Sequence, residues 1–170
     1  MAVIIKKIFR PFLLLFGFFS LIMNRAEWSY IYYMYRKKYC ISSSVSFIGK
    51  NIIFEGDGEI IIGNHSHIAR NSWLSSYNKD KIIIGKNCRI GQNVVMVTNN
   101  TIADQYFSKT MDFSSEDIVL GDYVWVGCNV FIKEGVTIGD NSVIGANSVV
   151  TKSVPSNCKV LGATIVKKNI

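Results

Sequence analysis

The sequence predicts an all-β solenoid preceded by a helical segment, and three regularities in its second half carry this prediction. An aliphatic residue recurs at every sixth position, a glycine usually follows it, and a small or β-branched residue stands four positions after it. The aliphatic series is Leu120, Val126, Ile132, Ile138, Ile144 and Val150. A period of six residues fits neither an α-helix nor a strand that alternates every second residue. It is typical of short strands joined by sharp turns, with three strands to a triangular coil and a buried column of aliphatic side chains.

The first forty residues, 1–40, form an apolar and basic segment for which we expect helices. Seven lysines and arginines precede the repeats, against one acid, Glu27. The apolar run between them, residues 11–23, is shorter than the ~20 residues that a helix needs to cross a bilayer. We expect two helices that lie on or dip into a membrane surface, with basic residues toward anionic lipid and aromatic residues at the interface. The alternative is that these helices cap the open end of the solenoid.

Residues 41–170 are expected to form the solenoid domain, because the six-residue period extends toward the N-terminus with two interruptions. The shorter insertion, 76–81, is polar. The longer one, 99–117, follows no period of six and contains acids, amides and aromatic residues. A long loop that breaks a repeat tends to be functional, because the scaffold does not need it.

The composition indicates a single domain without a metal centre. A chain of 170 residues is long enough to bury a core. Its four cysteines form no CxxC pair and no metal-ligand spacing, so we expect free thiols in a reducing cytoplasm. The net charge of +7 is concentrated among long apolar runs rather than on a polar face, and nucleic acid is therefore not expected as a partner. We expect a cytoplasmic protein, peripheral at the inner membrane face.

The stretch from Ile118 to Val154 resembles the hexapeptide-repeat acyltransferases. The segments that carry the resemblance are DYVWVG at 122–127, GVTIGDN at 135–141, VIGANSVVTK at 143–152 and the closing turn VLGA at 160–163. The resemblance covers most of the solenoid and implies a left-handed parallel β-helix, a homotrimer with active sites between subunits, and acetyl-CoA as the donor. Within the family, the long loop and the basic, apolar N-terminus look most like bacterial O-acetyltransferases of surface polysaccharides.

The resemblance also implies catalytic positions. In the galactoside and maltose acetyltransferases, the base is a histidine at the mouth of the long loop, accompanied by an asparagine from an earlier coil and a tryptophan after the loop. On this chain the tryptophan is Trp125 and the asparagine is Asn71, while the histidine position is taken by Asn100, or by Asn99 with a shift of one residue. An amide cannot accept a proton at neutral pH, so Asn100 cannot be the base.

The two histidines, His65 and His67, are the next candidates for a base. Stacking the coils by their period places His67 in an outward column with Arg89 and Trp125, two rungs or on the order of 10 Å from the tryptophan. His67 is therefore a candidate for a relocated base or for acceptor binding, or else an ordinary surface histidine. Other carboxylate bases could come from the loop, where Asp104 and Asp112 stand.

Coenzyme A is expected to contact residues of the last coils. Trp125 offers an exposed aromatic platform. The small corner at Gly145 and Ala146 allows backbone N–H groups to approach the thioester. Lys152 and Lys167, with Lys168, could meet the phosphates or could equally be exposed tail charges.

The predicted function is an acetyl-CoA-dependent O-acetyltransferase that acts on a sugar hydroxyl of a bacterial surface polysaccharide or its lipid-linked precursor. One alternative is a catalytically impaired trimer that binds a glycan or acts as a scaffold, because Asn100 replaces the family's histidine. Another is an N-acetyltransferase on a nucleotide amino sugar. A zinc hydratase on this fold would need three histidine ligands, which two histidines only two residues apart fit badly.

Overall fold

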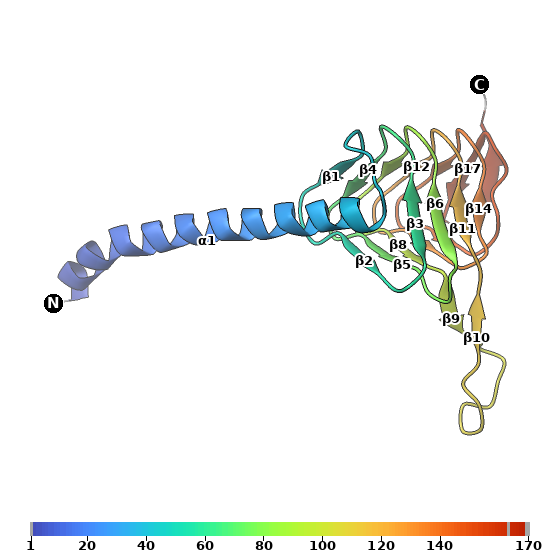
Figure 1. Cartoon of the computed structure of the whole chain (residues 1–170), viewed down its shortest axis with the longest axis horizontal. Helices are drawn as coiled ribbons and strands as arrows, with labels where there is room; N and C mark the ends of the chain where they lie inside the picture. Colours follow the sequence, from blue (N-terminus) through green and yellow to red (C-terminus); the bar gives the residue numbers. More distant parts are fainter. Residues whose placement is uncertain (1, 163, 169–170) are drawn as a thin grey trace. The chain divides into compact units, whose positions relative to one another are not determined.

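The chain forms a parallel β-solenoid preceded by one helix (Figure 1). The computed structural model describes the backbone of residues 2–162 and 164–168, and side chains from residue 14 onward. It divides into two compact units, Met1–Met34 and Tyr35–Ile170, which are described separately. The predicted fold class, a parallel β-helix with a helical N-terminal segment, is confirmed. Ala163, in the predicted closing turn, lies outside the described residues.

Three parallel sheets form the sides of the solenoid. The strands are β1 Ser46–Ile48, β2 Ile53–Glu55, β3 Glu59–Ile62, β4 His67–Ala69, β5 Trp73–Ser75, β6 Lys81–Ile84, β7 Arg89–Ile90, β8 Val95–Val97, β9 Asn99–Thr101, β10 Phe113–Ser115, β11 Ile118–Leu120, β12 Trp125–Val126, β13 Phe131–Ile132, β14 Thr137–Ile138, β15 Val143–Ile144, β16 Val149–Val150, β17 Cys158–Leu161 and β18 Thr164–Lys167. The first sheet has the order β1-β4-β7-β12-β15-β17-β18, the second β16-β13-β8-β5-β2 and the third β14-β11-β6-β3. All neighbours within them are parallel except β17 and β18, which are antiparallel.

The core is a set of vertical columns of aliphatic side chains. In the third sheet Ile62 pairs with Ile84, Ile84 with Leu120, and Leu120 with Ile138, as the six-residue period predicts. All four side chains are at most 7% exposed. The glycine after the aliphatic residue is needed where coils approach closely, because a Cβ on Gly85 would lie 2.4 Å from the carbonyl oxygen of Gly121.

Asparagines occupy the corners between the first and second sheets. Asn71, Asn93, Asn129 and Asn147 all have positive φ, between 57° and 60°. This left-handed conformation is one that asparagine tolerates better than most residues. The amides also bond to one another, since Asn93 Nδ2 donates to Asn129 Oδ1 at 2.8 Å and Asn129 Nδ2 donates to Asn147 Oδ1 at 3.1 Å. The left-handed backbone at this corner is therefore a structural reason for an asparagine at position 71, beside the catalytic role that the family resemblance implies.

The N-terminal segment is one helix, α1, which spans Ala2–Lys38 (Figure 1). The expectation of two helices is wrong. Residues 24–38, which follow the apolar run, contain neither glycine nor proline, so no residue ends the helix there. Among the residues whose side chains are described, no helix offers a stretch long and apolar enough to cross a membrane.

The residues at the end of α1 close the first coil. The ring of Tyr35 stacks on Phe54 with 4.7 Å between centroids, and Tyr39 meets the same ring edge-on at 5.8 Å. The Arg36 guanidinium donates hydrogen bonds to the carbonyl oxygens of Ser42 and Val45. These contacts cover the aromatic ring that would otherwise be the open end of the core.

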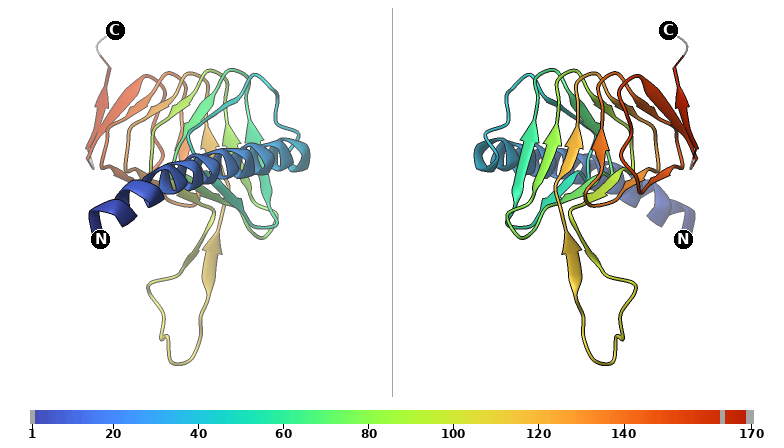
Figure 2. Two further views of the ribbon diagram at one scale, coloured as in Figure 1. Left: turned by 90° about the vertical axis from the view of Figure 1, so that its left-hand side faces the viewer. Right: turned by 90° about the vertical axis from the view of Figure 1, so that its right-hand side faces the viewer.

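The long insertion folds as a β-hairpin that projects from the solenoid (Figure 2). Its strands β9 and β10 are antiparallel, with Asn100 opposite Ser114. At its far end, Gln105 links both sides: Nε2 donates to the carbonyls of Ile102 and Asp112, and Oε1 accepts from the backbone N–H of Asp112 at 2.7 Å. The hairpin is therefore an ordered element with a defined root and tip.

Candidate functional site

The root of the hairpin lies at the edge between the second and third sheets. The chain leaves the second sheet after β8 and enters the third at β11, where Ile118 pairs with Ile82 of the coil before. Because the coil resumes in register, the two hairpin strands are fixed side by side at this edge. Asn100, which is expected from the family resemblance to occupy the histidine position, is part of this root.

A buried carboxylate anchors the root from the next coil. Glu134, in the corner between β13 and β14, accepts hydrogen bonds from Asn100 Nδ2 and from Ser114 Oγ, the latter at 2.7 Å. Lys133 Nζ lies 2.8 Å from Glu134 Oε1. The Glu134 side chain is only 3% exposed, whereas that of Lys133 is 45% exposed. A carboxylate, an amide, a hydroxyl and an ammonium thus meet at one point of the molecular edge.

The Glu134 carboxylate is held in its charged form. Burial by itself would raise its pKa, but the hydrogen bonds from Lys133, Ser114 and Asn100 together outweigh burial and lower the pKa below the ordinary value. Glu134 is therefore ionised at neutral pH. Hydrogen bonds to an ionised group are stronger than those between neutral groups, which makes this cluster a firm attachment for both hairpin strands.

The opposite side of the root has a second, more open cluster. Ser115 Oγ donates to Asp80 Oδ2 and accepts from Asn78 Nδ2, the latter at 3.3 Å. Ser114 and Ser115 are neighbours on β10 and point to opposite sides, as expected for a strand. A serine–carboxylate pair thus holds the hairpin on each side, Ser114 with Glu134 and Ser115 with Asp80. The side with Glu134 also has a hydrogen bond from Asn100.

Sequence reasoning missed Glu134, Ser114 and Lys133. The available signal was an acid, Glu134, in the most regular part of the repeat, at a corner whose counterparts in earlier coils are Ser76 and Thr98 by strand register. Both of those residues are fully buried. An acid in that series has to find partners or remain charged in an apolar setting.

The other predicted catalytic residues lie elsewhere on the solenoid. His67, Arg89 and Trp125 follow one another in the first sheet, as predicted, and Trp125 is 56% exposed. Asn71 stands at the corner between the first and second sheets. One chain therefore does not bring Trp125, Asn71 and Asn100 together on one face. Asp104 and Asp112 are exposed on the outer part of the hairpin rather than at its root.

The residues predicted to contact coenzyme A lie in the last coils. Gly145 and Ala146 form the corner after β15, and the Gly145 N–H is occupied, since it donates to the Val160 carbonyl at 2.8 Å. Lys152 lines a hollow of about 260 Å³ with Val149, Val154 and Ile165. Lys167 is on β18, opposite Cys158, and Lys168 Nζ lies 3.1 Å from Asn141 Oδ1.

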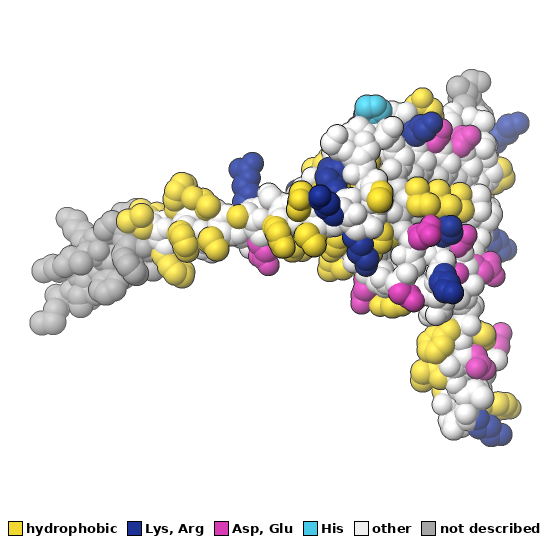
Figure 3. Space-filling model, in the orientation of Figure 1, with side chains coloured by type: hydrophobic (Ala, Val, Ile, Leu, Met, Phe, Trp, Pro, Cys, Tyr) yellow, Lys and Arg dark blue, Asp and Glu magenta, His cyan; other side chains and the backbone are white. Residues whose placement is uncertain are grey.

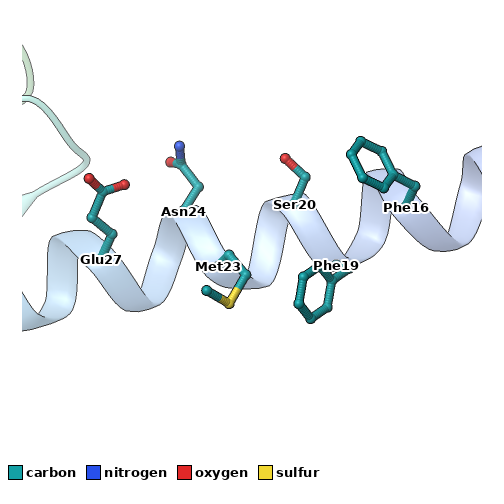
Figure 4. A pocket seen from close by; sticks show the side chains of 6 residues that line it. All are labelled: Phe16, Phe19, Ser20, Met23, Asn24 and Glu27. Carbon is teal, nitrogen blue, oxygen red and sulfur yellow. The ribbon is translucent and has the colours of Figure 1, made fainter.

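A shallow hollow on α1 does not qualify as a catalytic site. It is lined by Phe16, Phe19, Ser20, Met23, Asn24 and Glu27. These residues recur every three or four positions on successive turns of one helix (Figure 4). A single helix offers no opposing wall and no convergent polar groups for a reaction.

The chain is a β-helix of hexapeptide coils with a polar cluster on one edge, and known proteins share its repeat and its fold. Residues 117–152 match the family described as bacterial transferase hexapeptide (six repeats), and residues 81–98 match the hexapeptide repeat of succinyl-transferase. Galactoside O-acetyltransferase of Escherichia coli K12 is 34% identical over 131 residues, which cover 75% of this chain and 64% of that enzyme. The chain thus spans slightly less than two thirds of that relative.

Two further proteins match over a larger share of their length. WcaF of Escherichia coli K12, named as a colanic acid biosynthesis acetyltransferase, is 30% identical over 130 residues, 72% of this chain and 69% of WcaF. A hexapeptide-repeat acetyltransferase of Vibrio cholerae, solved with acetyl coenzyme A, superimposes with a TM-score of 0.65 at 28% identity, over 88% of this chain and 81% of that one. The chain belongs to the hexapeptide-repeat transferase family.

Replacing Glu134 by glutamine should destabilise the protein at neutral pH by about 1–3 kcal/mol, because hydrogen bonds to a buried charge are lost. The folded-state pKa of Glu134 is lowered from 4.5, so its contribution is present above pH 4.5 and is lost as the pH falls through the folded-state pKa. Urea unfolding of the wild type and of Glu134→Gln at pH 7 and pH 3.5 should therefore show a difference that shrinks in acid. The exposed Glu116→Gln is the control, and equal stability of Glu134→Gln and wild type at pH 7 would contradict the prediction.

Proposed function

We propose that the protein is an acetyl-CoA-dependent O-acetyltransferase that acetylates a sugar hydroxyl of a bacterial surface polysaccharide or of its lipid-linked precursor. Membership of the hexapeptide-repeat family is the observation that carries the proposal. Galactoside O-acetyltransferase is named for acetyl transfer to a galactoside, and WcaF is named as an acetyltransferase of colanic acid biosynthesis. The Vibrio protein was solved with acetyl coenzyme A. The hairpin root adds the polar groups that acyl transfer to a hydroxyl requires.

The proposed donor site uses the last coils. Trp125 is exposed and flat enough to receive part of coenzyme A, while the corner at Gly145 and Ala146 lets a ligand approach the backbone. Lys152 and Lys167 supply positive charge for the phosphates.

The proposed active site is shared between the subunits of a homotrimer. Trp125 faces outward from the first sheet and Asn100 stands at the edge of the second and third, so they can meet only across an interface. The second sheet also carries an apolar outward column of Ile53, Trp73, Val95, Phe131 and Val149. Ile53, Trp73 and Val149 are 45%, 41% and 58% exposed, which is unusual for a surface without a partner.

A catalytically impaired trimer that binds a glycan or serves as a scaffold is the second candidate function. The observation that favours it is Asn100, whose amide nitrogen is committed to Glu134 and whose side chain cannot accept a proton. Activity of the wild type separates the two candidates.

The purified protein should consume acetyl-CoA in the presence of bacterial polysaccharides or lipid-linked oligosaccharides and release free thiol. Amine acceptors such as nucleotide amino sugars are assayed in parallel, since N-acetylation would share the donor. Asn100→His distinguishes the candidates further: if the site is degenerate, histidine at this position should restore transfer to a silent protein. Wild-type protein that transfers acetyl to no hydroxyl acceptor would contradict the proposal.

Light scattering after size-exclusion chromatography should give three times the 19.1 kDa mass of the chain. Val149→Glu, which places a charge in the apolar column of the second sheet, should dissociate the trimer and lower acetyl transfer at least 100-fold. Thr137→Glu, on the exposed face of the third sheet, is the matched control and should leave mass and rate unchanged. A monomeric wild type would refute the shared site.

The proposed acceptor lies at a membrane, and α1 supports membrane attachment. Eight exposed apolar residues occupy positions 14 to 23 of the helix, at 49–72% exposure (Figure 3). They are Leu14, Leu15, Phe16, Phe18, Phe19, Leu21, Ile22 and Met23. Near-consecutive positions point in all directions around a helix, so this stretch is apolar on every side rather than on one face.

The types of residue change along the axis of the helix instead. Aromatic residues such as Trp28, Tyr30 and Tyr33 follow the apolar stretch, and its last turn contains Arg36, Lys37 and Lys38. Basic residues also precede the apolar stretch, at positions 6, 7 and 10, and Arg25 follows it. An apolar stretch with basic residues on both sides and aromatic residues beside it is typical of a helix at the interface of an anionic bilayer. The helix is therefore proposed to lie on the membrane surface, with its apolar stretch dipping into one leaflet.

The protein should sediment with vesicles of phosphatidylglycerol and phosphatidylethanolamine, and more weakly with neutral phosphatidylcholine. The double variant Leu15→Glu/Phe19→Glu should bind at least tenfold more weakly, because charged side chains are costly in hydrocarbon. Phe107→Ser removes an equally exposed apolar residue from the hairpin and serves as the control. Binding of the double variant at the wild-type level would show that α1 is not the anchor.

A further inference from the structure

The hairpin root contains a hydroxyl in contact with a buried carboxylate, in the place where the family resemblance puts a base. Ser114 Oγ is half-buried and donates to Glu134 Oε1 at 2.7 Å. Its lone pairs can accept a hydrogen bond from an incoming hydroxyl while its own proton points at Glu134. That is the arrangement of a two-step proton relay.

Glu134 differs from the other carboxylates of this region. Asp104, Asp112, Glu116 and Asp117 are exposed, and Asp80 is half-buried. Glu134 is the buried acid of the group and contacts Asn100 and Ser114 on both hairpin strands. A charge in such a setting acts on its neighbours with little screening by water.

Asn100 completes the arrangement without accepting a proton. Its Nδ2 donates to Glu134, which fixes the plane of the amide. Its Oδ1 is then oriented as an acceptor that can hold, but not deprotonate, a substrate hydroxyl. The proton has to leave by another route, and Ser114 is the neighbouring group that can take it.

We propose that Ser114 and Glu134 are the proton-accepting pair of this enzyme, in place of a histidine base; this inference rests on the acetyltransferase activity proposed above. The acceptor hydroxyl gives its proton to Ser114 Oγ as the serine proton moves to Glu134 Oε1, and the acceptor oxygen attacks the thioester carbonyl carbon. The tetrahedral intermediate collapses with cleavage of the C–S bond. The proton returns from Glu134 through Ser114 to the departing thiolate, so that acetyl ester and free coenzyme A are formed.

The charged groups around the pair set its pH dependence. Lys133 faces Glu134 from the same corner, Asn100 and Ser114 from the hairpin, Glu116 stands near Gly135 after the hairpin, and Lys152 occupies the equivalent corner of the next coil. The hydrogen bond from Lys133 lowers the pKa of Glu134. Removing Lys133 should therefore raise the pKa of Glu134 and move the acidic limb of the pH–rate profile to higher pH. The wild type should show no inflection in the range where histidine titrates.

The experiment compares Glu134→Gln and Ser114→Ala with Asp80→Asn, using acetyl-CoA and the best acceptor of the wild type. Asp80 anchors the other side of the hairpin through Ser115 and is the matched control for a purely structural role. We expect kcat to fall at least 100-fold in the first two variants, with KM for acetyl-CoA within threefold of wild type, and Asp80→Asn to keep its rate within threefold. Thermal unfolding verifies that each variant is folded. Ser114→Ala leaves the Lys133–Glu134 pair intact and tests the relay if Glu134→Gln does not fold.

The pH profile gives a readout that an anchoring role would not change. Lys133→Met should shift the acidic limb upward, whereas Asn100→His should introduce an inflection near pH 6–7. A rate for Glu134→Gln or Ser114→Ala within threefold of an active wild type, or an unshifted limb in Lys133→Met, would overturn the relay and leave the acetyltransferase assignment standing. A wild type without acetyl transfer would overturn both.

Discussion

Stacking of like side chains from one coil to the next is the interaction on which the rest of the structure depends. Each buried isoleucine or leucine of the column Ile62, Ile84, Leu120 and Ile138 contributes about 1.5–3 kcal/mol of apolar burial, and only in register. An insertion is compatible with this register if it leaves at a corner and the chain resumes in phase. The hairpin does so, because Ile118 pairs with Ile82 after the interruption. The position of every polar group at the hairpin root follows from that constraint.

The columns could be predicted because they depend on local period alone. Side chains that are one coil apart share a phase, so His67, Arg89 and Trp125 were placed on one outward column from sequence and are found there. The same reasoning could not reveal the continuity of α1. An apolar run followed by a Tyr-rich basic stretch suggests two environments, whereas residues 24–38 contain neither glycine nor proline and the helix continues through them to Lys38.

The polar cluster could not be predicted, because its partners are distant in sequence. Glu134 lies 34 residues from Asn100 and 20 from Ser114. The corner is already buried in the earlier coils, as Ser76 and Thr98 show, but the residues that would pair with an acid there could not be read from the repeat. The hairpin itself was expected only as a functional loop, since no six-residue phase existed to predict its pairing. For Asn71 the family resemblance implies a catalytic role from sequence, and the structure adds a conformational reason for the same residue, its positive φ.

Trp125 and the Glu134 cluster, the two parts of the proposed site, lie at the same level along the solenoid axis. Trp125 begins the coil that contains Glu134, since β12 and β13 are consecutive strands of that coil, and the hairpin of the previous coil reaches over to the same level through Asn100 and Ser114. A three-fold rotation about an axis parallel to the solenoid leaves height unchanged. In the proposed trimer, Trp125 of one subunit and Glu134 of the next therefore lie at the same level, on an outward face and on an edge. Coil stacking keeps Trp125 and Glu134 apart within one chain, and it also fixes the level along the axis at which they would meet between two subunits.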